Sequence, residues 1–432
     1  MKHNRKLVRG FAVVALFTAL AGDALRYSIT WYGWTAVALG LTVIAIVLLV
    51  RTRARWRIST LPFPLIAFVV LAFVSTAWSS YPLWSAAGAF STLITVIIAA
   101  ALAIALTRDE LLWALGIALR LILGLSLLFE LVISVFVRQP ILPWWVDYGG
   151  QKIYAAYYWS RDLLFTGDRI QGIVGNSNLL GFVALLGLIV FAVQLASRRV
   201  RLGWGTFWLV IAAAGLALTR SATVTVALVA VVAVAIILVL VRRARTTRGR
   251  VTVSVVSLII VAAGIVTALL KSTVVFELLG KSDSLTGRTG IWSAVVSLAD
   301  QRPGVGWGWI SYWFPTIAPF NNKKFVIHGV QYLQAHDAWL DVWFQLGIVG
   351  LVVFGALVLS TVVRSWLIAV EVPATAGTRG LASASTLLPV LILVALLAQS
   401  LTESRLLIEY GMLLLTLFAI RSKRDLQEPV AP

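Results

Sequence analysis

Two polar segments decide how this chain is organised: SDSLTGRTGIWSAVVSLADQRPGVGWGWISYW (282–313) and YLQAHDAWLDVWFQLG (332–347). They lie within a longer stretch, residues 271–346, which is flanked on both sides by almost wholly apolar sequence. The stretch is rich in Gly, Trp, Asp and Lys, and it contains Arg288 and His336. Long structured loops usually carry function. We therefore predict that this stretch holds the active region and that the apolar sequence is its frame.

The flanking sequence has the composition of a membrane protein. Hydrophobic residues make up 60% of the chain and charged residues 12%, and the mean hydropathy is +0.95. Repeated apolar runs of about 20 residues indicate transmembrane helices rather than a soluble domain. The absence of cysteine excludes disulfides, thiol nucleophiles and thiolate metal ligands. The presence of only three histidines argues against a His-rich metal centre. We also expect no cofactor.

The apolar runs predict an all-α polytopic membrane protein with about 12 transmembrane helices. A large extracytoplasmic loop is expected between spans 9 and 10. The chain then divides into residues 1–270 with spans 1–9 and an outer loop near 138–175, the large loop at 271–335, and residues 336–432 with spans 10–12 and a cytoplasmic tail. The expected spans are 8–25, 32–50, 60–78, 84–106, 111–137, 175–196, 203–219, 221–241, 251–270, 336–363, 383–401 and 405–420.

The charge distribution sets the expected orientation. A net charge of +19 is compatible with nucleic-acid binding, but most of it lies in short segments between the spans. The segments assigned to the cytoplasm carry 22 of the 36 Lys and Arg residues, notably RTRARWR (51–57) and RRARTTRGR (242–250). This bias predicts that both termini are cytoplasmic and that the basic segments contact membrane lipids, not nucleic acid. The N-terminus is similar to a signal peptide, but the many spans that follow favour an uncleaved first span.

Four arginines lie next to the predicted outer ends of spans. They are Arg169 in GDRIQG, Arg220 in LALTRSAT, Arg288 in TGRTGIW and Arg405 in LTESRLL. An arginine so close to hydrocarbon is costly unless it snorkels or has a partner. Either each one anchors a helix end at the headgroups, or several converge on an anionic ligand such as a lipid pyrophosphate, which guanidinium groups bind bidentately.

His336 opens an apolar helix, and an unperturbed histidine can accept a proton at neutral pH. Its alternative role is that of an interfacial or core histidine that only makes hydrogen bonds. Asp337 and Asp341 share a helix face. Asp337 is either an acid at the helix N-terminus, favoured by the helix dipole, or the group that orients the imidazole.

Other polar residues near the expected outer face also have two alternative roles. Asn176 and Asn178 in GNSN either cap the sixth span or bind a polar ligand. Glu403, beside Arg405, either forms a salt bridge or cap or orders the arginine cluster. In RPGVGWGWISYW (302–313), Gly306 and its neighbouring glycines permit close backbone approach, and the tryptophans stack on sugars or lie at the interface. The spacing is not a nucleotide-binding fingerprint.

These motifs, in this order, resemble the O-antigen ligase and polymerase superfamily of bacterial envelope enzymes. The resemblance rests on TRSAT (219–223), TGR (286–288) before the loop, the Gly-rich segment after PGVG (303–306), and a histidine that opens the helix ending in QLGIVGL (345–351). Two departures concern the acceptor. His336-Asp337 stands where the family commonly has His-Asn, and Trp307 and Trp309 stand where a proline and an asparagine are expected.

The resemblance implies a metal-independent inverting glycosyltransferase. It would move a saccharide from an undecaprenyl-diphosphate carrier to a hydroxyl of a glycan, lipid or protein, at the outer face of the cytoplasmic membrane of a bacterium. His336 would activate the acceptor, and Arg288, Arg220 and Arg169 would bind the pyrophosphate. The supporting residues would be Asp337, Glu403, Arg405, Asn176, Asn178 and Gly306.

Other functions remain open from sequence. A repeat-unit polymerase of the same superfamily differs from a ligase only in its acceptor. A non-enzymatic transporter or flippase predicts charged residues at mid-span, and only Arg120 and Glu130 in the fifth span fit that expectation. A shape-division type peptidoglycan glycosyltransferase also uses a lipid diphosphate, but the late position of the long loop and the His-opened helix favour the first assignment.

Overall fold

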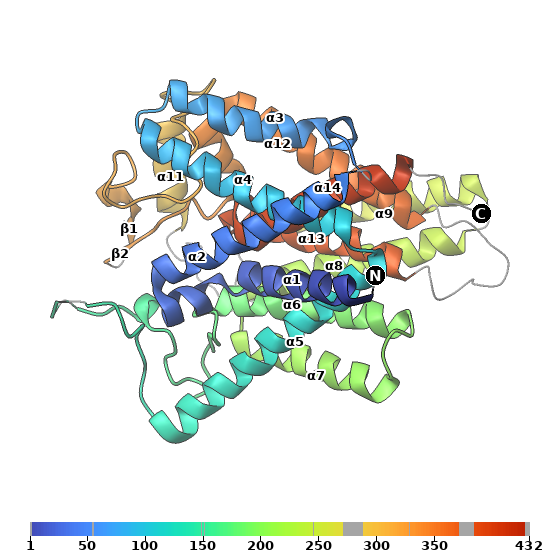
Figure 1. The fold of residues 1–432 in the computed structure, drawn as a ribbon, viewed down its shortest axis with the longest axis horizontal. Coiled ribbons are helices and arrows are strands. Elements are labelled where there is room, and N and C mark those ends of the chain that lie inside the picture. The colour runs from blue at the N-terminus through green and yellow to red at the C-terminus, as the bar shows by residue number, and fades with distance from the viewer. Residues whose placement is uncertain are drawn as a thin grey trace.

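Long helices packed side by side form most of the molecule, which is seen here in a computed structural model (Figure 1). The structure describes residues 2–53, 56–147, 149–150, 152–244, 246–270, 288–327, 329–370 and 384–427. The helices are α1 (Lys2–Leu20), α2 (Gly22–Arg51), α3 (Phe63–Val74), α4 (Pro82–Ala105), α5 (Arg108–Val132), α6 (Ser177–Ala196), α7 (Leu202–Thr219), α8 (Ala222–Arg243), α9 (Thr247–Leu270), α11 (Arg288–Ala299), α12 (Ala338–Val370), α13 (Leu388–Ser400) and α14 (Glu409–Gln427). A small antiparallel hairpin, β1 (Val326–Ile327) and β2 (Val330–Gln331), precedes α12.

Each of the expected spans overlaps one of these helices, but some boundaries are wrong by several residues: α2 begins at Gly22 rather than near residue 32, and the first expected span runs across the junction of α1 and α2. Among the described residues, seven helices are long and apolar enough to cross a membrane: α2, α4, α5 with its extension to Val137, α6, α7, α8 and α12. The apolar helices at 63–77 and 385–400 are shorter. Within the expected large loop, residues 288–335 contain α11 and the hairpin, and residues 271–287 lie outside the described part of the chain.

Polar residues between the apolar runs start the helices. Thr107 and Glu110 form a capping box at α5, because the Thr107 side chain accepts from the Glu110 amide and Glu110 accepts in return. The Asn176 side chain caps α6, and the Ser221 side chain accepts from the Val224 amide at the start of α8. These caps satisfy backbone donors that a helix leaves unpaired at its first turn.

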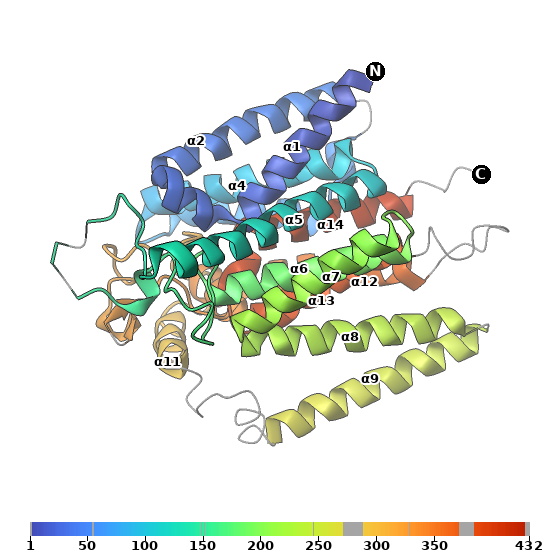
Figure 2. The ribbon, with the colours of Figure 1, turned by 90° about the horizontal axis from the view of Figure 1, so that it is seen from below.

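The two ends of the helix bundle differ in character (Figures 1 and 2). At one end lie α11, the hairpin and the segment joining α5 to α6, and we call this the loop end. At the opposite end, called the terminus end, the start of α1 meets the start of α5 through Arg5 and Glu110, and the end of α14 meets it through Asp425 and Arg108. The described part of the large polar loop is therefore separated from the start of α1 and the end of α14 by the length of the bundle.

Hydrogen bonds from the Gly-rich segment stabilise a break in helix α12. Gly347 has φ 64° and ψ −163° inside this helix, so the helical hydrogen-bond ladder is interrupted there. The carbonyls of Pro303 and Gly304 accept from the amides of Ile348 (2.8 Å) and Val349 (3.2 Å). On the other side of the break, the Gly308 amide donates to the carbonyl of Gln345 at 2.9 Å. The segment thus pairs backbone groups that the break leaves open.

This packing gives Trp309 a different place from those expected, whereas Gly306 makes the close backbone approach that the sequence predicts. Trp309 is fully buried and its indole donates to the Thr92 hydroxyl at 3.0 Å. The indole of Trp307 donates to the Leu298 carbonyl at 2.8 Å. A Cβ on Gly306 would lie 2.4 Å from the carbonyl carbon of Gln345. Neither alternative given for Trp309, stacking on a sugar or lying at the interface, is correct, because this ring is an internal packing group. Gly306 serves the contact with α12.

We predict that Gly347→Ala lowers the unfolding temperature of the detergent-solubilised protein. A Cβ at this position would lie 2.2 Å from the Gly304 carbonyl oxygen, and φ is positive, so the cost should be at least about 2 kcal/mol. The control is Gly355→Ala in the same helix, where nothing lies within 4 Å of the new Cβ. Equal unfolding temperatures for the two variants would contradict the supporting role of the Gly-rich segment.

Candidate functional site

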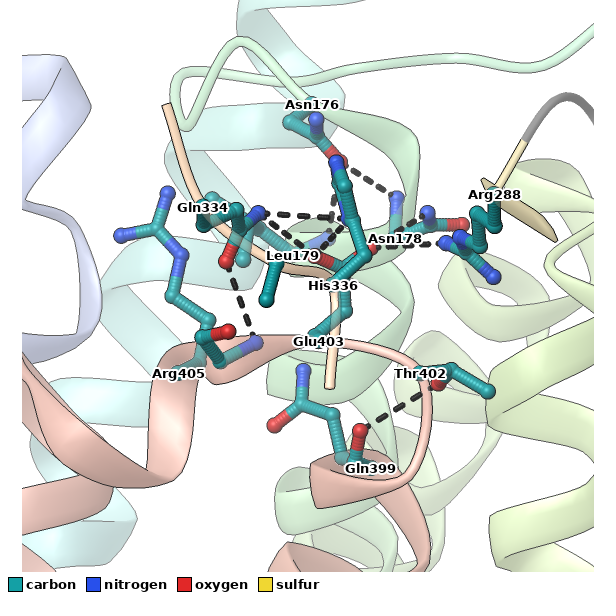
Figure 3. Close-up of polar contacts among 12 residues, drawn as sticks. Asn176, Asn178, Leu179, Arg288, Gln334, His336, Gln399, Thr402, Glu403 and Arg405 are labelled. Carbon is teal, nitrogen blue, oxygen red and sulfur yellow. Dashed lines mark hydrogen bonds and ion pairs between the residues drawn. The ribbon is translucent and has the colours of Figure 1, made fainter. Parts of the chain in front are cut away.

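The carboxylate of Glu403 lies at the centre of a polar cluster at the loop end (Figure 3). Its Oε2 is 2.9 Å from Nδ1 of His336 and accepts from Nε2 of Gln334 at 2.8 Å. Its Oε1 accepts from Nη2 of Arg288 at 3.0 Å and from Nδ2 of Asn178 at 3.2 Å. Glu403 is 5% exposed, so these contacts replace water. One buried carboxylate therefore joins four segments that are distant in sequence.

The surroundings of Glu403 keep it ionised. Burial alone would raise its pKa, because a charged group is disfavoured away from water. The charge and hydrogen bond of His336, together with the charges of Arg288 and Arg405, outweigh burial and lower the pKa of Glu403 to about 2. The carboxylate is therefore an acceptor only, over the whole physiological range.

An ionised Glu403 decides which nitrogen of His336 carries the proton. A carboxylate cannot donate, so Nδ1 must be the donor in the 2.9 Å contact. In the neutral imidazole, Nε2 then holds the free electron pair. This arrangement of a base oriented by a carboxylate is the one that general-base catalysis uses.

The turn before α12 fixes the imidazole. His336 has a left-handed backbone with φ 53°. Directly after it, Oδ1 of Asp337 accepts from the amides of Trp339 (2.8 Å) and Leu340 (2.9 Å). Directly before it, the Ala335 amide donates to Asp341 at 3.3 Å, and the Ala335 carbonyl accepts from the Trp292 indole at 3.1 Å. The turn is thus held on both sides of the histidine.

Asp337 is therefore the helix acid and not the orienting group. Burial raises its pKa, while the two amide hydrogen bonds act in the opposite direction. Orientation of the imidazole falls to Glu403, which is 67 residues further along the chain. The alternative in which Asp337 orients His336 is wrong, because its contacting oxygen faces the first turn of α12.

A cavity of about 240 Å³ adjoins this cluster. Tyr332, Gln334 and His336 line it from the segment between the hairpin and α12. They alternate along an irregular segment, and alternate residues of an extended chain point to the same side. The other lining residues are Ala156, Asn176, Asn178, Leu179, Arg288, Val330, Glu403 and Arg405. The cavity thus combines a positioned base, two guanidinium groups and polar amides.

Arg405 is held at the cavity wall by acidic residues of two other elements. It forms ion pairs with Glu409 at the start of α14 and with Asp23 at the start of α2, the latter at 3.7 Å. Burial would lower the pKa of Arg405, but these two carboxylates outweigh it and raise the pKa. Glu409 and Asp23 also pair with the buried Arg26. Arg405 therefore brings a permanent, firmly placed positive charge to the cavity.

Arg169 reaches the cavity through Asn178. Its Nη2 donates to Oδ1 of Asn178 at 2.6 Å and its Nε donates to the Thr219 carbonyl at 3.1 Å. The Ser221 hydroxyl also donates to Oδ1 of Asn178, at 2.9 Å. Asn178 in turn donates to Glu403. Burial lowers the pKa of Arg169. The residue orders the site, and pyrophosphate binding by Arg169 stays a prediction.

Arg220 lies between α7 and α8 with a left-handed backbone, φ 44°. Its side chain is exposed and is not among the residues that line the cavity. Both neighbours, Thr219 and Ser221, contact the Arg169–Asn178 pair. The structure therefore places Arg220 beside the site, with Arg288 and Arg405 inside it.

Some of the residues that line the cavity were predicted from the sequence, and others were not. His336, Arg288, Glu403, Arg405, Asn176 and Asn178 come together as lining residues. Gln334, Tyr332 and Ser221 were missed, and the only available signal was the two-residue spacing before His336. His328 and the side chain of His3 lie outside the described residues. No group of three or more His, Asp and Glu residues suited to a metal occurs in the described part of the chain.

A comparison with protein families matches residues 206–355 to the model described as O-antigen ligase. The matched segment is similar to the O-antigen ligase family. This confirms the resemblance to the O-antigen ligase and polymerase superfamily. The O-antigen ligase segment contains Arg220, Arg288 and His336, whereas Glu403, Arg405 and Asn178 lie outside it. A comparison with curated proteins found no match. With its apolar helices, this O-antigen ligase-like chain is an integral membrane protein.

We predict that Glu403→Gln loses stability in a pH-dependent way. Because the pKa of Glu403 is lowered from 4.5 to about 2 on folding, its ionisation stabilises the folded state above pH 4.5, by roughly 3 kcal/mol, and this contribution disappears as the pH falls through 2. The unfolding-temperature gap between wild type and Glu403→Gln should therefore shrink as the pH falls below 4.5. Asp300→Asn, at an exposed aspartate, should show no such trend. A gap independent of pH would show that the carboxylate charge is not what holds the cluster.

Proposed function

We propose that the protein is a glycosyltransferase that transfers a saccharide from an undecaprenyl-diphosphate carrier to an acceptor hydroxyl at the outer face of a bacterial cytoplasmic membrane. The observation that supports this most directly is the 2.9 Å contact between Glu403 and His336 beside two arginines in one cavity. The O-antigen ligase match of residues 206–355 supports the reaction class. Under this proposal the loop end of the bundle faces outward and both termini are cytoplasmic.

In the proposed reaction, His336 is the general base. Its Nε2 accepts the proton of the acceptor hydroxyl while the oxygen forms a bond to the anomeric carbon of the donor sugar. Glu403 stabilises the imidazolium that results, because it already faces Nδ1. A base placed in this way contributes about 10²–10⁴-fold to a rate. The single displacement inverts the anomeric centre.

The leaving group needs positive charge. As the new bond forms, the bond from the anomeric carbon to the diphosphate oxygen breaks and its electron pair passes to the diphosphate. Arg288 and Arg405 line the cavity, so their guanidinium groups are suited to stabilise this growing charge in a poorly hydrated place. Arg220, exposed beside the site, is proposed to extend the pyrophosphate contact. No step in this scheme requires a metal ion.

A transporter is less well supported by the contacts within the fifth span. Both oxygens of Glu130 are occupied: Oε1 accepts from the amides of Gln171 (2.9 Å) and Gly172 (2.7 Å), and Oε2 accepts from the Ser160 hydroxyl (2.9 Å). This carboxylate holds the loop end in place and is not a mobile relay. Ligase and polymerase share the proposed chemistry, and the product separates them.

We predict that His336→Ala reduces release of undecaprenyl diphosphate by at least about 10²-fold, because the acceptor proton loses its base. The assay uses purified protein, an undecaprenyl-diphosphate-linked saccharide and EDTA. Glu403→Gln should keep part of the activity, since the imidazole remains but loses its orientation. A ladder of products would indicate a polymerase and a single adduct a ligase. Wild-type rates in His336→Ala would remove histidine from the mechanism.

We also predict that Arg288→Ala abolishes transfer while the protein still inserts in the membrane. The loss of a guanidinium that contacts a diphosphate should lower kcat/KM by 10²-fold or more. The matched control is Arg138→Ala, an exposed arginine at the loop end that does not line the cavity. An Arg288→Ala enzyme as active as Arg138→Ala would show that the diphosphate binds elsewhere.

A further inference from the structure

A second polar cavity lies at the terminus end of the bundle, between the starts of α1 and α5 and the junction of α6 and α7. Its volume is about 700 Å³. Four arginines line it, Arg5, Arg9, Arg120 and Arg199, and only two carboxylates, Asp109 and Glu110. The described lining therefore has two positive charges in excess. The proposed transfer reaction uses none of these residues.

The carboxylates are already engaged by the outer arginines. Glu110 pairs with Arg5 at 3.0 Å and with Arg9 at 3.2 Å. Asp109 pairs with Arg199 at 2.8 Å, at an exposed position on the rim. No carboxylate among the described residues pairs with Arg120. One of the two excess charges therefore lies at Arg120, and the other is shared by Arg5 and Arg9 around Glu110.

Arg120 is 8% exposed and poorly satisfied. Its Nη2 donates to Oε1 of Gln194, its guanidinium carbon lies 4.8 Å from the Phe191 ring centroid, and its buried Nε has no hydrogen-bond partner among the described residues. A buried guanidinium without a counter-charge is costly in an apolar bundle. An anion in the adjoining cavity would offset that cost.

Gln194 and Gly116 together allow the side chain of Arg120 to reach the cavity. Gln194 is fixed by its own hydrogen bond to the Leu112 carbonyl at 2.9 Å, which draws Arg120 back toward the start of α5. A Cβ on Gly116 would lie 2.2 Å from Nε2 of Gln194 and 3.0 Å from Nη1 of Arg120. The glycine thus leaves room for both side chains.

The walls of the cavity distinguish a lipid from a soluble anion. Trp113 and Trp204 line it and are 42% and 52% exposed, and Leu112 and Ile117 add apolar surface. Tryptophans at a helix end are typical of the membrane interface. We propose that this cavity binds the phosphate of an anionic phospholipid, with Arg120 as the inner contact and the aromatic wall against the lipid's glycerol and upper acyl region.

The test is thermal unfolding of the full-length purified protein in detergent with added phosphatidylglycerol, phosphatidylcholine or inorganic phosphate. A ligand that binds only the folded state raises the unfolding temperature. We expect phosphatidylglycerol to give the largest rise and inorganic phosphate none. An equal rise with inorganic phosphate would overturn the lipid assignment, and no rise with phosphatidylglycerol would overturn the site.

Variants place the effect in this cavity. Arg120→Met removes the buried charge, so it should keep or raise the unfolding temperature without lipid and weaken phosphatidylglycerol binding about tenfold or more. If the role of Arg120 were purely structural, Arg120→Met would instead lower the unfolding temperature both with and without lipid.

The matched control is Arg198→Gln, at an exposed neighbouring arginine outside the lining. This variant should keep the full rise in unfolding temperature with phosphatidylglycerol. Arg199→Gln leaves the interior untouched and should lose part of the rise. A full rise in Arg199→Gln or in Arg120→Met would overturn the proposal.

Discussion

The loop end depends on one carboxylate buried among donors. An ionised group removed from water is stable only when its oxygens are paired, and Glu403 meets this condition through a histidine, an arginine and two amides. Those four partners come from the start of α6, the start of α11 and the turn before α12. The position of each partner is therefore set by the same requirement, and loss of one leaves a buried charge that the others must compensate.

Buried carboxylates that accept several hydrogen bonds also occur at two other places where irregular backbone contacts the helices. Glu130 accepts two backbone amides and a hydroxyl from the segment that joins α5 to α6. Asp341 accepts the Trp313 indole, the Gln345 amide and the Ala335 backbone amide. The helices satisfy their own backbone, so the loops between them need acceptors supplied from the bundle. Three buried carboxylates supply them and give the loop end a fixed shape.

The sequence predicts the frame well and the site in part. Apolar runs of sufficient length locate the helices because burial of the backbone in a membrane requires them. His336 and Arg288 are visible as polar residues at the edges of such runs. The pairing of His336 with Glu403 cannot be predicted from the sequence, because it depends on how α12 packs beside α13. Local spacing offered Asp337 as the orienting group only as one of two alternatives. The burial of Trp309 likewise depends on tertiary contacts, because its amide and its indole donate to Ser75 and Thr92.

The contact of Nδ1 with Glu403 also restricts how the proposed catalyst is reset. With Nδ1 committed and the carboxylate strongly acidic, the imidazole has a single exchangeable face. A proton taken up at Nε2 during transfer has to depart from Nε2, either to the released diphosphate or to water in the cavity. In each turnover of such a site, Nε2 is first protonated and then deprotonated. The next acceptor cannot be activated until the previous proton has left Nε2.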